Sequence, residues 1–320
     1  MTELMEFIKE YLEEAINNNN YCYYLSRKKM TGYRIVNRPT YSPSDFDITK
    51  YLKFSDKFNE YILEFNDILN STFSNEYSTL FNKNIKTVKM IDYKLRIIEK
   101  MKDLIMDTSY ASYDTYTNSI EILKKQKNDT KLKKTVFHEL LHLSSSSDLI
   151  FSGFSQECLT KKGLTIIGNG LNEGYTEHLN RTYFSDCGND YSYHDHVQFA
   201  AMIEEIVGKE FMMDCYFKNG LEPFLKRFGS IINDEGKAID LVLDLDSLLD
   251  KPNAFIYKDK YNKVRKDLVN YYEISLNNKL NNGIISTEEY NLRKKVNIDD
   301  FINGFDYYDF DVEKNNSKKM

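Results

Sequence analysis

The chain has 320 residues, which is enough for one large domain or two ordinary ones with a full hydrophobic core. Hydrophobic residues make up 41% and charged residues 29%, and this balance excludes a largely disordered protein. The formal net charge of −6 is spread along the chain without a basic stripe, which argues against nucleic acid as a partner. The four cysteines lie far apart and form no CxxC pair, so we expect neither a zinc ribbon nor a disulfide scaffold.

In the first third of the chain, apolar residues at helical spacing predict helices over residues 3–16, 56–69 and 91–106. The first of these is charged and amphipathic, and it lacks the apolar centre of a signal peptide. No apolar run in the sequence is long enough to span a bilayer. We therefore expect a cytoplasmic protein without a membrane partner.

A short strand interrupts the helical pattern in the middle of the chain. Apolar and polar residues alternate there, which predicts a strand over residues 120–123. Further helices are predicted over residues 130–143, 171–184 and 197–207, and again from about residue 254. Because only 4 Pro and 13 Gly interrupt the chain, we expect a mainly α fold (α+β) with a small sheet.

The order of these elements predicts a central domain between two helical segments. The central domain, over residues 86–250, holds the predicted strand and the motifs described below. A helical segment over residues 1–85 precedes it. A second helical segment with a loose tail, over residues 251–320, follows it.

The sequence HELLH, from His138 to His142, lies inside the helix predicted over residues 130–143. Two residues four apart lie about 40° from each other on a helix, so both imidazoles can reach one ion. Glu139 points about 60° away from His142, which places it beside the ion. Imidazole is a preferred zinc ligand, and a nearby carboxylate can accept a proton from water in the fourth position. The motif predicts a metal site with Glu139 as general base.

A second motif, NEGYTE over residues 172–177, offers carboxylates to the same site. Glu173 and Glu177 share one helix face, where two carboxylates repel each other unless a cation lies nearby. A metal bound by one carboxylate, with a ligand histidine hydrogen-bonded to the other, removes this conflict. Taken alone, the pair is typical of an ordinary acidic helix face. Taken with HELLH, it predicts the third metal ligand.

Together, HELLH and NEGYTE resemble the gluzincin metallopeptidases, whose familiar members are the thermolysin-like enzymes. They are more similar still to HExxH proteins of low-GC Gram-positive bacteria whose second motif is Asn-Glu-Gly-x-Thr-Glu. The resemblance covers residues 110–230. It implies a zincin-like catalytic domain with one zinc ion per chain, bound by His138, His142 and Glu173. It also implies that Glu139 is the general base and that Glu177 orients a ligand histidine.

Two differences from the thermolysin-like group concern the third ligand. The gap of 31 residues between His142 and Glu173 is longer than in that group, and Glu177 stands where those enzymes have Asp. Because Glu is one methylene longer than Asp, Glu177 could bind the metal while Glu173 orients the histidine. Glu177 is therefore the alternative ligand.

The resemblance also implies a reaction. It indicates a zinc-dependent peptidase that hydrolyses a peptide or protein substrate with activated water. The strand over residues 120–123 would be the edge strand along which an extended peptide lies. The alternative is a catalytically inactive protein with a zincin fold that acts in interaction or regulation.

Several other residues were weighed for the site. Tyr193, His194 and His196 precede the helix predicted over residues 197–207 and are candidates for contacts to the oxyanion or the substrate. A surface histidine pair is the competing interpretation. The helical angle turns His178 away from Glu173, which indicates a structural role. The acidic stretch over residues 241–249 lacks the glycine and closing glutamate of an EF-hand, so an amphipathic helix or strand is predicted there.

Overall fold

The computed structural model describes most of the chain. The described residues are 23–26, 29–32, 47–52, 54–73, 75–91, 110–115, 118–122, 128–147, 151–160, 163–184, 193–249, 254–299 and 301. The helix predicted over residues 3–16 and the predicted C-terminal tail lie outside them. So does the helix predicted over residues 91–106, apart from Ile91, which ends a strand.

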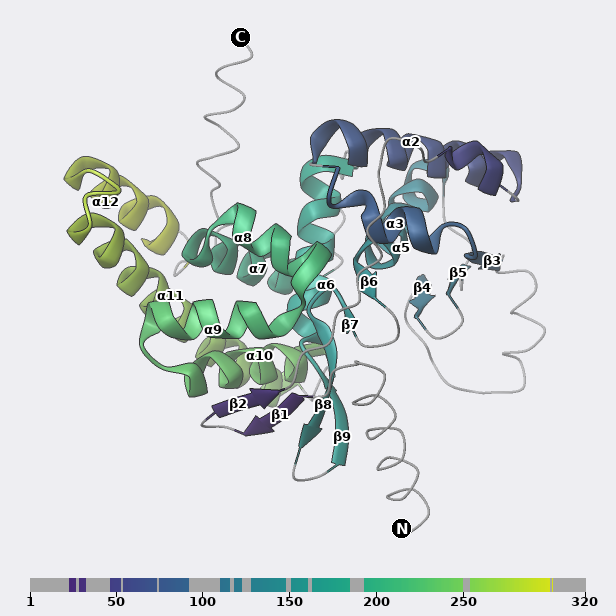
Figure 1. Cartoon of the computed structure of the whole chain (residues 1–320). Coiled ribbons are helices and arrows are strands. Elements are labelled where there is room, and N and C mark those ends of the chain that lie inside the picture. Colours follow the sequence, from purple (N-terminus) through teal and green to yellow (C-terminus); the bar gives the residue numbers. More distant parts are fainter. Residues whose placement is uncertain are drawn as a thin grey trace.

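Helices make up most of the described structure, as the composition predicted (Figure 1). Those before the HELLH motif are η2 (Ile48–Tyr51), α2 (Asp56–Thr72) and α3 (Ser78–Asn84). The motif helix and its successors are α5 (Asp129–Ser145), α6 (Asn169–Leu179), η3 (Asn180–Phe184), α7 (His194–Val207), α8 (Lys209–Asp214), η4 (Cys215–Asn219), α9 (Leu221–Ile232), α10 (Glu235–Leu249), α11 (Ala254–Asn281), α12 (Thr287–Arg293) and η5 (Lys294–Asp299). Among the described residues, none of the helices combines the length and apolar character needed to cross a membrane.

The described strands form two small sheets. The first contains β3 (Lys89–Ile91), β4 (Ala111–Asp114) and β5 (Ser119–Ile122). The second contains β1 (Tyr23–Ser26), β2 (Lys29–Gly32), β6 (Ser146–Ser147), β7 (Phe151–Ser152), β8 (Ser155–Thr160) and β9 (Gly163–Ile167). In the first sheet β5 pairs in parallel with β3 and antiparallel with β4. In the second the order is β2-β1-β8-β7-β6, and β9 pairs with β8.

The position of β5 corrects one expectation from the sequence. A strand is present where it was predicted, but β5 lies between β3 and β4 and is not an edge strand. All four of its residues are buried, as expected for a strand with a neighbour on either side. The strand predicted over residues 120–123 was therefore wrongly assigned to the edge. Among the strands that the structure describes, β4 forms the edge of this sheet nearest α5, and it packs against this helix.

Local signals and packing fix α5 at the centre of the molecule. The side chain of Asn128 caps its first turn by accepting a hydrogen bond of 2.9 Å from the Lys131 N–H. The helix then includes the whole of the predicted range 130–143. On its buried face, the ring of Phe137 packs against Phe65 of α2 and Phe184 of η3, at centroid distances of 5.6 and 6.2 Å. The HELLH motif therefore stands on a helix that is held in the core.

Helix α6 lies beside α7 and α10 and carries the NEGYTE motif (Figure 1). Its apolar face holds Tyr175, which packs against the buried rings of Phe154 and Tyr216 at centroid distances of 5.7 and 5.4 Å. At 100° per residue, Tyr175 lies about 200° from Glu173, so the two side chains point to opposite sides of α6. The opposite face of α6 is thus free to point toward α5.

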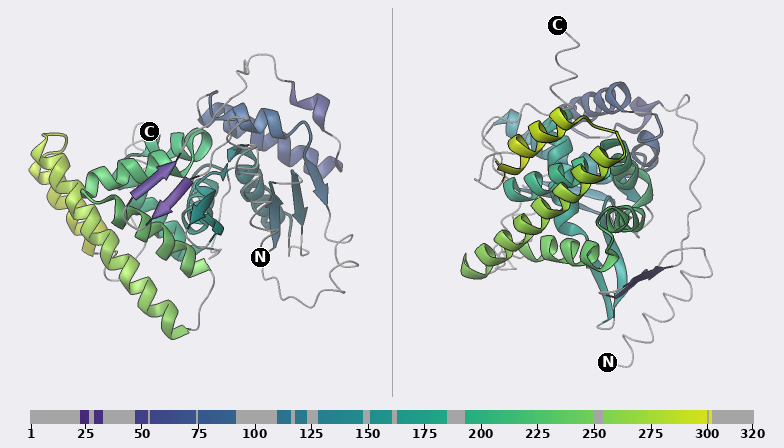
Figure 2. Two further views of the ribbon diagram at one scale, coloured as in Figure 1. Left: turned by 60° about the horizontal axis from the view of Figure 1, so that its bottom comes forward. Right: turned by 90° about the vertical axis from the view of Figure 1, so that its left-hand side faces the viewer.

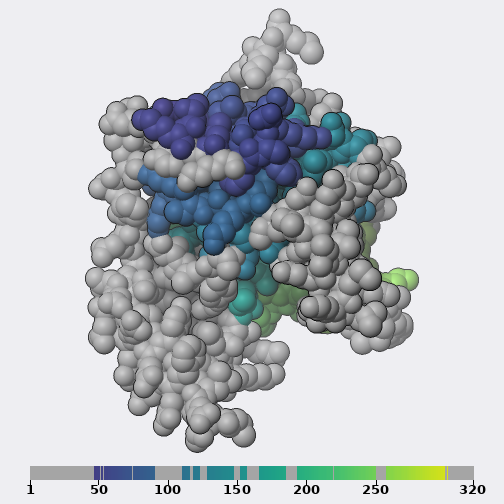
Figure 3. Space-filling view, turned by 90° about the vertical axis from the view of Figure 1, so that its right-hand side faces the viewer, coloured from purple at the N-terminus to yellow at the C-terminus, as the bar shows by residue number. Residues whose placement is uncertain are grey.

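The C-terminal helices pack onto the central helices (Figure 2). Helix α11 contacts α7, α9 and α10, and its residues Val264, Leu268 and Tyr272 are fully buried. Arg293 of α12 forms an ion pair with Glu205 of α7. On the side away from α11 and α12, α2 and α3 form much of the described outer surface (Figure 3). Buried residues from all three predicted segments join one hydrophobic cluster, and the segment boundaries stay a prediction.

Candidate metal centre

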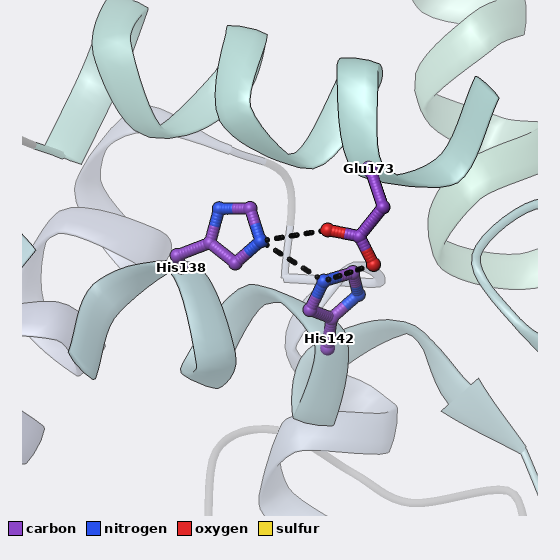
Figure 4. Close-up of side chains that lie close together, drawn as sticks. All are labelled: His138, His142 and Glu173. Carbon is purple, nitrogen blue, oxygen red and sulfur yellow. Dashed lines mark hydrogen bonds and ion pairs between the residues drawn. The ribbon is translucent and has the colours of Figure 1, made fainter. Parts of the chain in front are cut away.

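Two imidazoles converge on one face of α5 (Figure 4). His138 and His142 are one helical turn apart, and both are buried. Their Nε2 atoms lie 3.1 Å from each other. This is the arrangement that the four-residue spacing predicted. The pair presents two nitrogen ligands to a single point beside the helix.

Helix α6 adds a carboxylate to this point. The Glu173 Oε2 atom lies 3.2 Å from Nε2 of His138, and its Oε1 atom lies 3.5 Å from Nε2 of His142. One ligand atom from each of the three residues lies within 4.8 Å of the other two, so the group can hold a metal ion. The Glu173 side chain is 25% exposed, whereas the histidines are almost covered. Glu173 is therefore the most exposed of the three candidate ligands.

Glu177 contacts the other ring nitrogen of His138, Nδ1. Its Oε2 atom lies 3.1 Å from Nδ1 of His138, and its Oε1 atom lies 2.9 Å from Lys134 Nζ and 2.8 Å from Arg181 Nε. Burial alone raises the pKa of Glu177, but the hydrogen bond with His138 and the two cations lower it to about 2. The ionised Glu177 orients the ring so that Nε2 faces the other ligand atoms. The structure places Glu173, and not Glu177, beside both Nε2 atoms.

The charges of His138 and Glu173 stabilise each other. Burial lowers the pKa of His138, but its hydrogen bonds with Glu173 and Glu177 raise it to about 10. Burial raises the pKa of Glu173, and the charges of His142 and His138 shift it well below its usual value. A metal ion must displace the proton of His138, because only neutral imidazole binds a metal.

Asn172 was not assigned a role from the sequence, although it begins the NEGYTE motif. Its Nδ2 atom lies 3.3 Å from Nδ1 of His142, and its Oδ1 atom accepts a hydrogen bond of 3.1 Å from the Phe154 N–H. Each ligand histidine therefore has a polar neighbour from α6 on the nitrogen that faces away from the cluster. The only sequence signal for this role was the position of Asn172 next to Glu173.

Glu139 lies beside the ligand group, as its helical angle predicted. Its carboxylate is buried and accepts a hydrogen bond from the backbone N–H of Tyr113 in β4. Burial raises the pKa of Glu139, and the charges of His138 and His142 oppose this shift. A carboxylate with a raised pKa next to a metal site is suited to accepting and returning a proton.

Tyr193 covers one side of the centre. Its ring stacks on the imidazole of His138 at a centroid distance of 5.8 Å and an interplanar angle of 12°. Its hydroxyl hydrogen-bonds with Glu173, whose charge raises the pKa of Tyr193 far above its usual value. The residue is 37% exposed and has a φ of 55°, so a left-handed backbone turn directs it toward α5. Among the candidates Tyr193, His194 and His196, Tyr193 is the one seen to contact the ligand group. The helix begins at His194, three residues earlier than predicted, so both histidines belong to α7.

The two histidines of α7 make other contacts. His196 is buried, and its Nε2 lies 3.2 Å from the Leu245 carbonyl oxygen of α10, which explains why it does not face the ligand group. The Nε2 atom of His194 lies 3.0 Å from the amide nitrogen of Gln198. His178 lies on the back of α6, where its Nε2 atom is 3.6 Å from Oε1 of Glu204 on α7. This position agrees with a structural role.

Comparison with protein-family models, with curated proteins and with solved structures finds no match to this chain in any of the three. A function must therefore be inferred from the chain's own residues. The main feature is the convergence of three ligand atoms from two helices, with a buried carboxylate and a tyrosine at their side.

Proposed function

We propose that the chain is a zinc-dependent peptidase of the gluzincin type. The observation that carries the proposal is the group of His138, His142 and Glu173, with ligand atoms within 4.8 Å of one another. Two imidazoles and one carboxylate are the protein ligands of many catalytic zinc sites, which keep a fourth position for water. The exposed side of Glu173 gives solvent access to that position. A structural zinc site would instead be closed by four protein ligands.

The surroundings of the ligands also favour zinc chemistry. Glu177 accepts a hydrogen bond from Nδ1–H of His138, which leaves the Nε2 lone pair to face the ion. Lys134 and Arg181 keep Glu177 ionised, so this orientation is stable over the whole neutral pH range. The zincin-like catalytic domain that the motifs imply, over residues 86–250, belongs to this same proposal.

The mechanism assigns proton transfer to Glu139. A bound zinc ion supplies a Lewis acid that polarises the scissile carbonyl and lowers the pKa of a water molecule. Glu139 accepts a proton from the attacking water, whose oxygen forms a bond with the carbonyl carbon. Glu139 then passes the proton to the amide nitrogen as the carbon–nitrogen bond breaks. The Tyr113 N–H holds the carboxylate in place for both transfers.

Two further features support an amide substrate. The Tyr193 hydroxyl hydrogen-bonds with Glu173 beside the ligand group, where it can donate a hydrogen bond to the developing oxyanion. The edge strand β4 adjoins Glu139, so an extended peptide can pair with β4 and bring a backbone amide to the site. β4 takes over the role that the sequence analysis gave to residues 120–123.

The proposal is tested with Glu139→Gln. We expect the purified wild-type chain to contain about one zinc ion and to cleave members of a peptide mixture, as followed by mass spectrometry. Glu139→Gln should keep the zinc and lose activity by roughly 10²–10⁴-fold, because an amide cannot accept the proton. His142→Ala should lose the zinc as well.

Two outcomes would contradict parts of the proposal. A wild-type chain that binds no zinc refutes the metal centre. A chain that binds zinc but cleaves no peptide refutes the peptidase assignment, and a cellular effect unchanged by Glu139→Gln would then indicate the inactive interaction or regulatory protein.

A further inference from the structure

The helix that carries Glu173 begins without a cap of its own. Gly168 is the residue before α6, and it has no side chain to accept the free backbone N–H groups of the first turn. The neighbouring Asn169 is engaged elsewhere, since its Oδ1 accepts a hydrogen bond of 2.5 Å from the Ser155 hydroxyl. The free backbone N–H groups at the start of α6 must therefore find an acceptor in another element.

Asp246 of α10 supplies this cap from a distant part of the chain. Its Oδ2 atom accepts a hydrogen bond of 2.8 Å from the Gly168 N–H, and its Oδ1 atom accepts one of 2.7 Å from the Gly170 N–H. The carboxylate also lies at the positive end of the helix dipole, where a negative charge is favourable. Both oxygens of a single side chain thus bind the first turn of α6.

Close backbone packing makes this contact specific. A Cβ atom on Gly170 would lie 2.4 Å from the Leu245 carbonyl oxygen, so α6 approaches α10 as closely as only glycine permits. The same carbonyl oxygen lies 3.2 Å from Nε2 of His196 on α7. The adjacent residues Leu245 and Asp246 therefore join α10 to the starts of both α6 and α7.

The cap determines where Glu173 lies. Each residue of a helix advances about 1.5 Å and turns about 100°, so a small slip or rotation of α6 would move the Glu173 carboxylate away from the histidines. Metal–ligand distances tolerate a deviation of only about 0.2 Å. Two bonds to N–H groups two residues apart restrict both the slip and the rotation. Glu173 follows Gly170 by less than one turn.

We propose that Asp246 is a positioning residue for the metal centre: it caps α6 and thereby holds Glu173 in reach of the ion held by His138 and His142. The inference rests on the proposed zinc site. The acidic stretch over residues 241–249, which the sequence analysis interpreted as an amphipathic element, contributes through this one carboxylate.

The test measures zinc affinity of the metal-free full-length chain by competition with a chromophoric chelator. We expect Asp246→Asn, which can accept only one of the two bonds, to weaken zinc binding roughly tenfold, and Asp246→Ala to weaken it by up to about 100-fold. The control is Asp244→Ala, which removes an ion pair from α10 to Lys263 of α11. It should leave the zinc affinity unchanged even where it lowers the melting temperature.

A double-mutant comparison separates positioning from general stability. In a Glu173→Ala background, Asp246→Asn should no longer change the residual zinc affinity, because its effect acts through Glu173. A wild-type chain that binds zinc while Asp246→Asn and Asp246→Ala bind it equally tightly overturns this inference alone. An equal loss in the Glu173→Ala background also overturns it. A wild-type chain that binds no zinc overturns the proposed function and this inference together.

Discussion

Glu177 lies between one imidazole, two cations and the amide of Asn180, so four groups contact its carboxylate. Lys134 comes from α5, one turn before His138, and Arg181 follows α6 in η3. With both carboxylate oxygens engaged and only 3% of the side chain exposed, Glu177 has no room to bind an ion as well. Compared with an Asp at the same position, Glu177 is one methylene longer and so reaches His138 and the two cations. Glu173 is still the glutamate that faces the two Nε2 atoms.

Tyr193 gives the first prediction at the scale of single residues. Tyr193→Phe keeps the ring that stacks on His138 and removes only the hydroxyl near Glu173. We expect kcat for peptide cleavage to fall by roughly 10²–10³-fold, the loss typical of one oxyanion donor, with zinc content unchanged. Tyr290→Phe on α12 serves as the control. Full kcat in Tyr193→Phe would exclude the hydroxyl from the chemistry.

Glu204 gives a prediction about pH. It is buried on α7, accepts a hydrogen bond of 2.5 Å from the Tyr175 hydroxyl and lies 3.6 Å from His178. Burial alone raises its pKa, but the interactions with His178 and Tyr175 hold the pKa below the usual 4.5. Ionised Glu204 therefore stabilises the fold above about pH 4.5, and this contribution is lost as the pH falls through the lower folded-state pKa.

Urea unfolding measures this contribution. At pH 7, Glu204→Gln should lower the free energy of unfolding by about 1–3 kcal/mol, because the buried partners lose a charged acceptor. The difference from wild type should shrink below pH 4.5. Glu210→Gln, at an exposed position on α8, should stay within about 0.5 kcal/mol of wild type. A difference for Glu204→Gln that is the same at pH 7 and pH 3 would contradict the assignment.

At the scale of elements, Gly174 determines how closely α6 and α7 pack. A Cβ atom at this position would lie 2.4 Å from the His196 carbonyl oxygen. Gly to Ala in a helix normally stabilises by up to about 1 kcal/mol, but here the methyl group would force the two helices apart. We expect Gly174→Ala to destabilise the protein by about 1–3 kcal/mol in urea unfolding. A stabilising effect would mean that α7 can move away without cost.

The elements also show what a sequence can predict. The helix with HELLH was predictable within about two residues at either end, because helical spacing of apolar residues is a local property. The start of α12 was likewise predictable, since the Ser286 side chain accepts a hydrogen bond from the Glu289 N–H. β4 was missed because Ala111–Asp114 is polar and becomes a strand only by pairing with β5.

The same distinction applies to the site. The positions of His138 and His142 follow from the spacing on one helix, and Glu173 follows from the second motif. The Tyr113 N–H on Glu139 and the His196 contact with Leu245 join residues that lie far apart in the chain. No periodicity in the sequence records such contacts, so His196 was kept as a candidate for oxyanion or substrate contacts and Tyr113 was overlooked.

At the scale of the whole molecule, the C-terminal helices are part of the common core. Val264, Leu268 and Tyr272 of α11 are fully buried, and each large apolar side chain contributes about 1.5–3 kcal/mol when buried. We expect a chain truncated after residue 253 to lose its cooperative thermal transition, measured by circular dichroism. A chain that ends after Phe301 keeps these contacts and is the control. Cooperative melting of the shorter chain would show that α11 is dispensable for folding.

The contact between Asp246 and the start of α6 has a consequence for biosynthesis. Asp246 follows Gly168 by 78 residues and Gly170 by 76. A ribosome that has just completed α5 and α6 has therefore made all three ligand side chains, but not the carboxylate that caps the second helix. In the proposed zinc site, the nascent chain would reach its full zinc affinity only after α10 has been made and has packed against α6.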